Sequence, residues 1–253
     1  MGKHNYYNTK RIYYPEDFVE NMVITITQQK LHHLKNVLRV SIGDYVRLFN
    51  QQNGEWLAKI EQTEKNKLGL KILKQLRIYK NTQNISLMFT PLKKDSLHFL
   101  IEKLVELGVN KLIPILTERT IVRAINSSKI NSYILQATEQ CERLSLPEIV
   151  PLTKLNEAIS ALDPNEQIIF CDEKEENLSL NKLPPSLDIK KNYIILVGPE
   201  GGFTDQERQY LRKHKQILPV HIGPRILKAE TAAIFSMSCL QCLIGSISQH
   251  PRN

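Results

Sequence analysis

The sequence lacks several features that would place it in other protein classes. It has no run of roughly 18 or more apolar residues, so no transmembrane helix is expected. Residues 1–11 contain no apolar segment of the kind found in secretory signals, and a cytoplasmic location is therefore expected. The 4 cysteines are too few and too scattered for a disulfide framework.

Motifs for metals and nucleotide phosphates are also weak or missing. Cys239 and Cys242 form a single CxxC motif, and the apolar residues around them are typical of a buried helix, where cysteine only fills space. His32 and His33 are adjacent in sequence, and adjacent histidines rarely share a metal, so no metal site is expected. Neither GxGxxG nor GxxxxGK[ST] occurs, which disfavours a dinucleotide site, a kinase or an NTPase.

The positive charge is unevenly distributed along the chain. The formal net charge is +8, and residues 1–75 hold 12 Lys and Arg against 7 Asp and Glu. Such an excess in the smaller part favours nucleic acid as a partner, because Lys and Arg neutralise phosphates. A modest excess that only aids solubility is the alternative, and composition does not decide between them.

Residues 1–75 show the alternation of apolar and polar residues that is typical of short β-strands. Asn53 and Gly54 stand between two such stretches and predict a hairpin turn. Several short strands at this spacing favour a small closed β-barrel, expected as a separate domain. The expected strands are 22–27, 44–50, 55–61 and 68–74, with a short helix at 30–39.

Residues 76–253 show apolar stretches that alternate with helical patterns, which favours a parallel α/β sheet. Ligands of such sheets bind beyond the carboxyl ends of the strands. Residues 176–192 contain prolines and predict a surface loop. The expected strands are 84–90, 111–116, 166–171, 193–197 and 218–222, and the expected helices are 96–108, 128–144, 153–162, 204–214 and 230–247.

The stretch ILVGPEGGFTDQE, residues 195–207, places a glycine-rich turn between a strand and a helix. Thr204 and Glu207 fit a capping box, which predicts the start of the helix. Gly201 and Gly202 either let the backbone approach a ligand or only form a tight turn. Phosphate is disfavoured, because the cap uses free donors of the helix and Glu200 would repel an anion. S-adenosylmethionine, which is cationic and carries no phosphate, suits the turn better.

A second stretch, HIGPRILKAETA at 221–232, has the same layout of strand, Gly-Pro turn and helix. Together, LVGPEGGFTDQE and HIGPRILKAETAA resemble the C-terminal motifs of the ribosomal RNA small-subunit methyltransferase E family, which belongs to the SPOUT class. Lys228 departs from the pattern, because the family more often has arginine there, and a bidentate role for this residue is in doubt. Residues 32–44, 101–122 and 137–149 resemble further motifs of the family in the same order, so the resemblance covers nearly the whole chain.

This resemblance implies a fold and an activity. It implies a PUA-like, RNA-binding β-barrel at 1–75 and a SPOUT α/β domain at 76–253 with a trefoil knot, an exception to the rule that chains do not knot. The implied activity is S-adenosylmethionine-dependent methylation of N3 of a uridine in 16S ribosomal RNA, on the assembled 30S subunit, by a homodimer. A non-catalytic RNA-binding ribosome assembly factor remains the alternative.

The resemblance also implies roles for individual residues. Arg225 is expected to face the target base as a cation, and Glu230 to orient it or to accept the N3 proton. The alternative for Glu230, given equal weight, is that it only caps the N-terminus of a helix. Thr90-Pro91-Leu92 is a further candidate for the cofactor pocket. The two implied walls of that pocket are Leu196, Gly198, Glu200, Gly201 and Gly202, and Ile222, Gly223, Ile226 and Leu227.

Basic residues of the N-terminal part are the candidates for RNA contacts through phosphate or stacking. Arg119, Glu139 and Arg143 are weaker candidates for the active site. An ion pair between Glu139 and Arg143, which are four residues apart in an expected helix, is the alternative for these two. The expected RNA-binding residues are Lys10, Arg11, His32, His33, Lys35 and Arg39.

Overall fold

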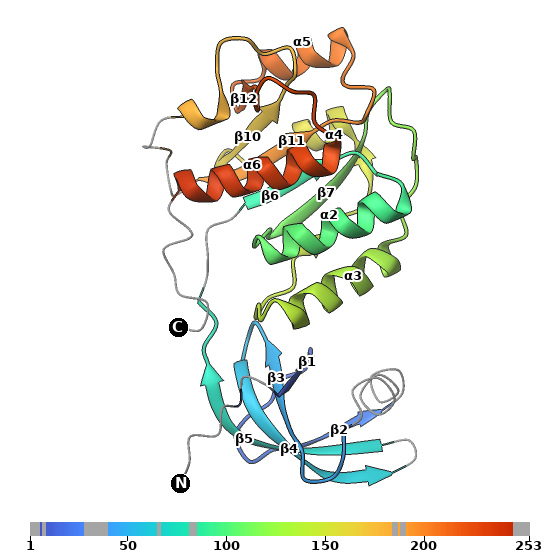
Figure 1. Ribbon diagram of the computed structural model, residues 1–253, viewed down its shortest axis with the longest axis vertical. Helices are drawn as coiled ribbons and strands as arrows, with labels where there is room; N and C mark the ends of the chain where they lie inside the picture. The colour runs from blue at the N-terminus through green and yellow to red at the C-terminus, as the bar shows by residue number, and fades with distance from the viewer. Residues whose placement is uncertain are drawn as a thin grey trace. The chain divides into compact units, whose positions relative to one another are not determined.

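A computed structural model of the chain describes residues 6, 9–27, 40–64, 67–80, 85–183, 187 and 191–244 (Figure 1). The chain divides into two compact units. The N-terminal unit comprises Met1–Asn81 together with Thr138–Ser145, and the C-terminal unit comprises Thr82–Ala137 with Leu146–His250. The expected helix at 30–39 lies outside the described residues.

The N-terminal unit is built on a five-stranded sheet in the order β1-β3-β4-β5-β2. β1 pairs parallel to β3 and the other neighbours pair antiparallel, which confirms the strands expected from the alternating pattern. Gly54 has a φ of 78° in the turn between β3 and β4, as the hairpin signal predicts. The strands are β1 (Lys10–Tyr13), β2 (Val23–Thr27), β3 (Tyr45–Asn50), β4 (Gly54–Glu64) and β5 (Lys67–Arg77).

The C-terminal unit contains a parallel sheet in the order β12-β10-β11-β6-β7-β8, with β9 paired to β7. Its central strands are buried on both faces, which explains their continuous apolar sequences. The strands are β6 (Ile85–Phe89), β7 (Lys111–Leu116), β8 (Glu148–Ile149), β9 (Thr153–Lys154), β10 (Glu166–Cys171), β11 (Asn192–Val197) and β12 (Ile217–Val220).

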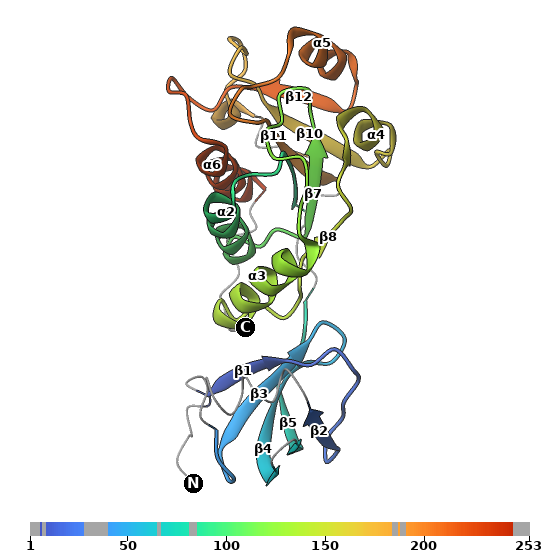
Figure 2. The same ribbon diagram turned by 90° about the vertical axis from the view of Figure 1, so that its right-hand side faces the viewer.

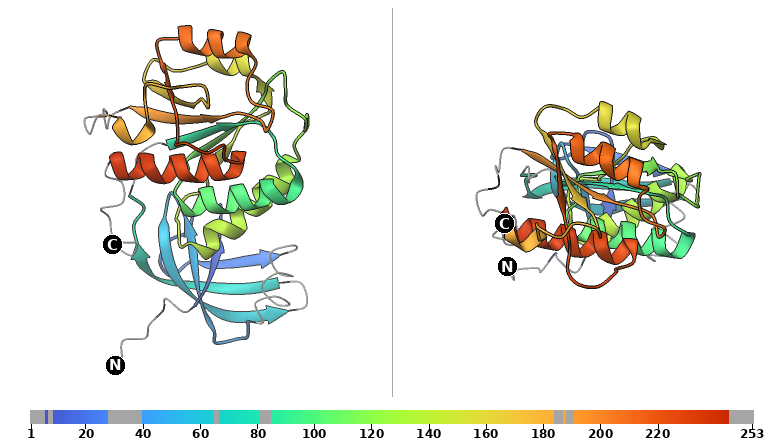
Figure 3. Two further views of the ribbon diagram at one scale, coloured as in Figure 1. Left: turned by 45° about the horizontal axis from the view of Figure 1, so that its top comes forward. Right: turned by 90° about the horizontal axis from the view of Figure 1, so that it is seen from above.

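Helices cover both faces of this sheet (Figure 2). α2 and α6 lie side by side on one face (Figures 1 and 3), whereas α4 and α5 supply Leu155, Ile159 and Leu211 to the apolar core of the other. The predicted parallel α/β fold is thereby confirmed. The helices are α2 (Lys94–Glu106), α3 (Ser127–Gln140), α4 (Leu155–Ser160), α5 (Asp205–Lys213) and α6 (Ala229–Leu243).

Part of the predicted surface loop at 176–192 has regular structure. Ser179 forms a parallel bridge with His221, and the short 3-10 helix η3 (Leu180–Lys182) follows. The backbone N–H of His221 donates to Leu178 O at 2.9 Å, and that of Leu180 donates to His221 O at 3.0 Å. The loop thus continues the sheet beside the end of β12, which its polar, proline-containing sequence does not indicate.

Candidate active site

The loops that follow β6, β7, β10, β11 and β12 meet at one edge of the C-terminal sheet, because parallel strands bring their carboxyl ends together. β11 lies beside β6, with Val197 opposite Phe89. Gly198 and Thr90 follow these two residues and therefore begin neighbouring loops at the centre of the edge. The glycine-rich turn predicted from sequence thus lies at the place where open α/β sheets hold ligands.

Pro199 to Gly202 form a tight turn, in which the Gly202 N–H donates to Pro199 O at 2.8 Å. Gly198 is required by packing: a Cβ atom there would lie 2.4 Å from the Phe203 ring. That ring stands edge-on to Phe170, with centroids 5.1 Å apart. Close approach by an aromatic side chain is therefore sufficient to explain glycine at 198.

The start of α5 is fixed by the predicted capping box. Thr204 Oγ1 accepts from the Glu207 N–H at 3.3 Å, and Glu207 Oε2 accepts from the Thr204 N–H at 2.8 Å. Glu207 Oε1 also accepts from the Glu118 N–H at 2.8 Å. Arg119 Nη1 donates to Gly201 O at 2.9 Å, so the loop after β7 is bound to the glycine-rich turn and to the first turn of α5.

A cluster of acids and arginines supports the same turn. Arg208, which is buried, binds Asp172 and Glu173, and Arg212 binds Asp172 at 2.7 Å. Gly202 has a φ of +66°, and a Cβ atom there would lie 2.7 Å from Glu173 Oε1. Glycine at 202 therefore has two local causes, its backbone conformation and the ion pair beside it.

Sequence reasoning missed this cluster. Two sequence features indicate the cluster. One is the acidic segment DEKEE, residues 172–176, directly after a strand, and the other is a pair of arginines four residues apart in α5. The Asn177 N–H and the nearby Arg212 guanidinium hold the pKa of Glu175 below its ordinary value. Hydrogen bonding to Asp172 raises the pKa of Arg212. Both shifts favour the charged forms, as expected for groups that pair with each other.

The loop from Ile222 to Lys228 precedes α6 and is much more open. Gly223 has a φ of +119°, and no atom lies within 4 Å of the point that a Cβ atom would occupy, so its conformation alone requires glycine. Arg225 is exposed, and Ile226 is 86 % exposed. Glu230, in the first turn of α6, accepts from Ser96 Oγ of α2 at 3.4 Å. The structure thus brings Glu230 to the start of α2 and leaves the Arg225 side chain in solvent.

Within the described part of the chain, Thr90 has a buried hydroxyl group at this edge that lacks a hydrogen-bond partner. Its side chain is buried, with only 1 % exposure, yet Oγ1 has no hydrogen-bond partner there. Buried hydroxyl groups normally have a partner, because an unsatisfied one costs about 1–3 kcal/mol. The hydroxyl lies at the end of β6, beside the start of the glycine-rich turn.

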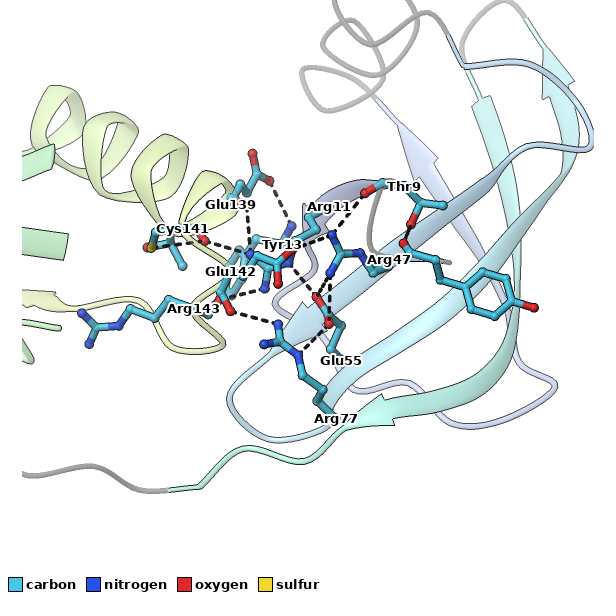
Figure 4. A network of polar contacts seen from close by, with 12 residues as sticks. Thr9, Arg11, Tyr13, Arg47, Glu55, Arg77, Glu139, Cys141, Glu142 and Arg143 are labelled. Carbon is cyan, nitrogen blue, oxygen red and sulfur yellow. Dashed lines mark hydrogen bonds and ion pairs between the residues drawn. The ribbon is translucent and has the colours of Figure 1, made fainter. Parts of the chain in front are cut away.

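The predicted RNA-binding residues do not form one described surface. Lys10 is exposed, and His32, His33, Lys35 and Arg39 lie outside the described residues. Arg11 is buried, which corrects its prediction as a surface contact (Figure 4). Its guanidinium donates to Glu55 Oε1 at 2.6 Å and to the carbonyl oxygens of Thr138, Glu139 and Arg143 at 2.9, 2.9 and 2.8 Å.

The arginines around Glu55 form a buried polar network in the N-terminal unit. Arg77 Nε lies 2.8 Å and Arg47 Nη1 lies 3.4 Å from the fully buried Glu55 carboxylate. Arg47 Nη2 also contacts Glu142 at 3.0 Å. Burial lowers the pKa of Arg11, and the neighbouring Glu55 opposes this shift. The four hydrogen bonds of the buried Arg11 guanidinium hold it within the unit, away from an RNA phosphate.

No group of three or more His, Cys, Asp or Glu residues suited to a metal occurs in the described ranges. Across those same residues no helix is long and apolar enough to cross a membrane. In α6, Cys242 is exposed and Cys239 is partly buried. Cys171 is buried, with Sγ 3.2 Å from Ser236 Oγ, so it packs β10 against α6.

Comparison with known proteins gives matches over nearly the whole chain. The model of the RNA methyltransferase domain family matches residues 79–241, and that of the RNA methyltransferase PUA domain family matches residues 26–73. The chain is 34 % identical over 239 residues to a ribosomal RNA small subunit methyltransferase E from Rickettsia conorii, an alignment that covers 93 % of this chain and 96 % of the relative.

Two solved structures share the fold. One is a ribosomal RNA small subunit methyltransferase E from Neisseria gonorrhoeae bound to S-adenosylmethionine, with a TM-score of 0.84, 27 % identity, and 93 % and 98 % coverage of the two chains. The other is a Legionella pneumophila protein in complex with the same cofactor, with a TM-score of 0.82, 29 % identity, and 92 % and 97 % coverage.

Proposed function

Because this chain belongs to the ribosomal RNA small subunit methyltransferase E family, we propose that it methylates N3 of a uridine in 16S ribosomal RNA with S-adenosylmethionine, acting on the assembled 30S subunit. One observation carries the proposal: the glycine-rich turn at 198–202 begins beside Thr90 at the centre of a parallel sheet edge. In this proposal residues 1–75 bind the RNA and residues 76–253, knotted as in the SPOUT class, carry the methyl transfer.

The residues at the sheet edge fit S-adenosylmethionine, whose sulfonium supplies an electrophilic methyl group. The unpartnered, buried Oγ1 of Thr90 offers a hydrogen bond to a polar group of the ligand. Glu200 is exposed and does not oppose a cation. We propose as lining residues Leu196, Gly198, Glu200, Gly201 and Gly202 from the first loop and Ile222, Gly223, Ile226 and Leu227 from the second.

Two charged residues are proposed for the chemistry at the base. Uridine N3 carries a weakly acidic proton, so attack by N3 requires removal of that proton and benefits from a cation near the developing anion. Arg225, exposed on the second loop, is the proposed cation. Glu230 is the proposed acceptor of the N3 proton, and its contact with Ser96 Oγ fixes the orientation of the carboxylate.

A homodimer is part of the proposal. Phe99 of α2 is 49 % exposed and Phe235 of α6 is 44 % exposed, and these helices pack side by side. Large apolar side chains on neighbouring helices favour a protein interface. We propose that a second copy of the chain covers them. Analytical ultracentrifugation of the wild type and of Phe235→Lys tests for the dimer. A buried lysine side chain at position 235 should dissociate it.

The decisive experiment is methyl transfer from labelled S-adenosylmethionine to small ribosomal subunits that lack the modification, followed by nucleoside mass spectrometry. We expect 3-methyluridine. Arg225→Ala should lower kcat about 10²- to 10³-fold with unchanged cofactor affinity, as for loss of one stabilising group in a transition state. Lys215→Ala is the matched control, because it removes an exposed cation at the opposite end of β12.

Three outcomes would contradict parts of the proposal. Full turnover of Arg225→Ala would exclude Arg225 from catalysis. Cofactor binding without methyl transfer would mean a different RNA or base. If the protein binds small subunits but not S-adenosylmethionine, the non-catalytic assembly factor becomes the better description.

A further inference from the structure

A row of side chains crosses three strands of the N-terminal sheet, four residues along β4 from the buried Glu55. Tyr45 of β3 lies opposite Lys59 of β4, and Lys59 lies opposite Lys71 of β5. Residues directly opposite each other in antiparallel strands point to the same face, with Cβ atoms about 5 Å apart. Tyr45 is 40 % exposed, and both lysines are half-buried. The long stems of the lysines thus lie on the sheet and their ammonium groups reach solvent.

A second tyrosine, Tyr6, and a third lysine, Lys74, lie beside this row. Lys74 lies opposite Leu57 of β4, next to a register shift in the pairing of β4 with β5. Its Nζ lies 4.8 Å above the ring centroid of Tyr6. The Tyr6 ring in turn lies 6.1 Å from that of Tyr45. We call Tyr6, Tyr45, Lys59, Lys71 and Lys74 the aromatic–lysine face.

The arrangement is unfavourable for the folded chain by itself. Like charges directly opposite each other across a sheet destabilise it, and Lys59 and Lys71 are such a pair. Neither lysine makes an ion pair with a carboxylate in the part of the chain that the structure describes. By contrast, Lys67, the first residue of β5, lies opposite Glu64. The unbalanced pair therefore fits an anionic partner better than a purely structural role.

We propose that the aromatic–lysine face binds single-stranded RNA, with the lysines on successive phosphates and Tyr45 as a stacking surface for a base. Proteins bind single-stranded nucleic acid by this combination of basic and aromatic side chains, since every base has a face that stacks. None of these five residues belongs to the RNA contacts expected from sequence. The inference rests on the proposed function, because it concerns where the substrate RNA docks.

The test is binding of a fluorescently labelled, unstructured RNA of about 16 nucleotides, measured by anisotropy between about 50 and 200 mM salt. Lys59→Gln with Lys71→Gln should weaken binding about tenfold at low salt and lower the slope of log affinity against log salt by about 1.4. Tyr45→Ala should weaken binding about tenfold with the slope unchanged, because stacking releases no counterions. The double variant Lys213→Gln with Lys215→Gln is the control, since it removes two exposed lysines from the C-terminal unit.

Unchanged RNA affinity in both face variants, or an equal loss in the control, would overturn the inference. So would an absence of RNA binding by the wild type. If the face variants bind this RNA normally but bind 30S subunits weakly, the face contacts a ribosomal protein and the inference is wrong. Calorimetry with S-adenosylmethionine on the wild type and on each variant separates these results from the non-catalytic alternative to the proposed function, in which the wild type binds no cofactor.

Discussion

Replacing Thr90 by valine tests the proposed cofactor site most directly. Valine keeps the shape of threonine and removes the hydroxyl group, whose oxygen is buried without a partner in the described part of the chain. If Oγ1 binds S-adenosylmethionine, its loss costs about 1–3 kcal/mol of binding free energy, which is a rise in Kd of roughly 5- to 150-fold. In the ligand-free protein, the same change removes an unsatisfied polar group and should raise the free energy of unfolding by about 1 kcal/mol.

The two quantities are measured separately, by calorimetric titration with S-adenosylmethionine and by thermal unfolding without ligand. The expected result is weaker binding by a protein that is as stable as the wild type or more so. Thr90→Ser is the matched control, because it keeps the hydroxyl group and loses only a methyl group. It should retain cofactor affinity to within a few-fold while losing some stability from the small cavity.

Two results would refute the reasoning. If Thr90→Val is more stable and binds S-adenosylmethionine with unchanged Kd, the hydroxyl does not face the ligand. A lower melting temperature together with weaker binding would mean that Oγ1 stabilises the protein itself, which also contradicts the assignment.

Three further predictions follow from the packing and the charges. Gly198→Ala should lower the melting temperature and the cofactor affinity, because its methyl group overlaps the Phe203 ring, and Phe203→Leu in the same chain should restore part of both. Glu55→Leu should cost about 3–5 kcal/mol in the N-terminal unit, since it leaves arginines buried without their carboxylate. The single tryptophan of the chain lies in β4, so urea titration followed by its fluorescence reports on this unit; an unchanged midpoint would show that the arginines find other partners. Burial raises the pKa of Cys171 to about 11, so iodoacetamide at pH 8 should label the exposed Cys242 first and Cys171 last in the folded protein, and equal rates by mass spectrometry would contradict the burial.

Local features of the fold were accessible from the sequence because their causes are close together in the chain. Thr204 and Glu207 are three residues apart and cap α5 as predicted. Asn53 and Gly54 stand at the start of β4, in the turn that they predict. The parallel sheet follows from apolar strands that alternate with helices. In the first two cases the partners lie within one element or its neighbouring turn, and in the third the alternation of strands and helices is itself visible along the chain.

The parts that sequence reasoning missed depend on partners far apart in the chain. Arg208 meets Asp172 only because β10 lies between β11 and β12, an order that the sequence pattern does not give. A glycine required by an aromatic ring, as at Gly198, looks the same in sequence as one required by a ligand. Likewise, the charge balance of residues 1–75 counts Arg11 and Lys10 equally, although Arg11 is buried and Lys10 is exposed.

The assignment of Thr138–Ser145 to the N-terminal unit has a consequence for the order of folding during synthesis. Carbonyl groups of this segment accept hydrogen bonds from Arg11 and Arg77, so residues 1–81 are synthesised before these partners exist. At about 5–20 residues per second, the nascent sheet waits roughly 3–13 s for them. During that interval the guanidinium groups of Arg11 and Arg77 lack these carbonyl partners and are solvated by water and counterions instead.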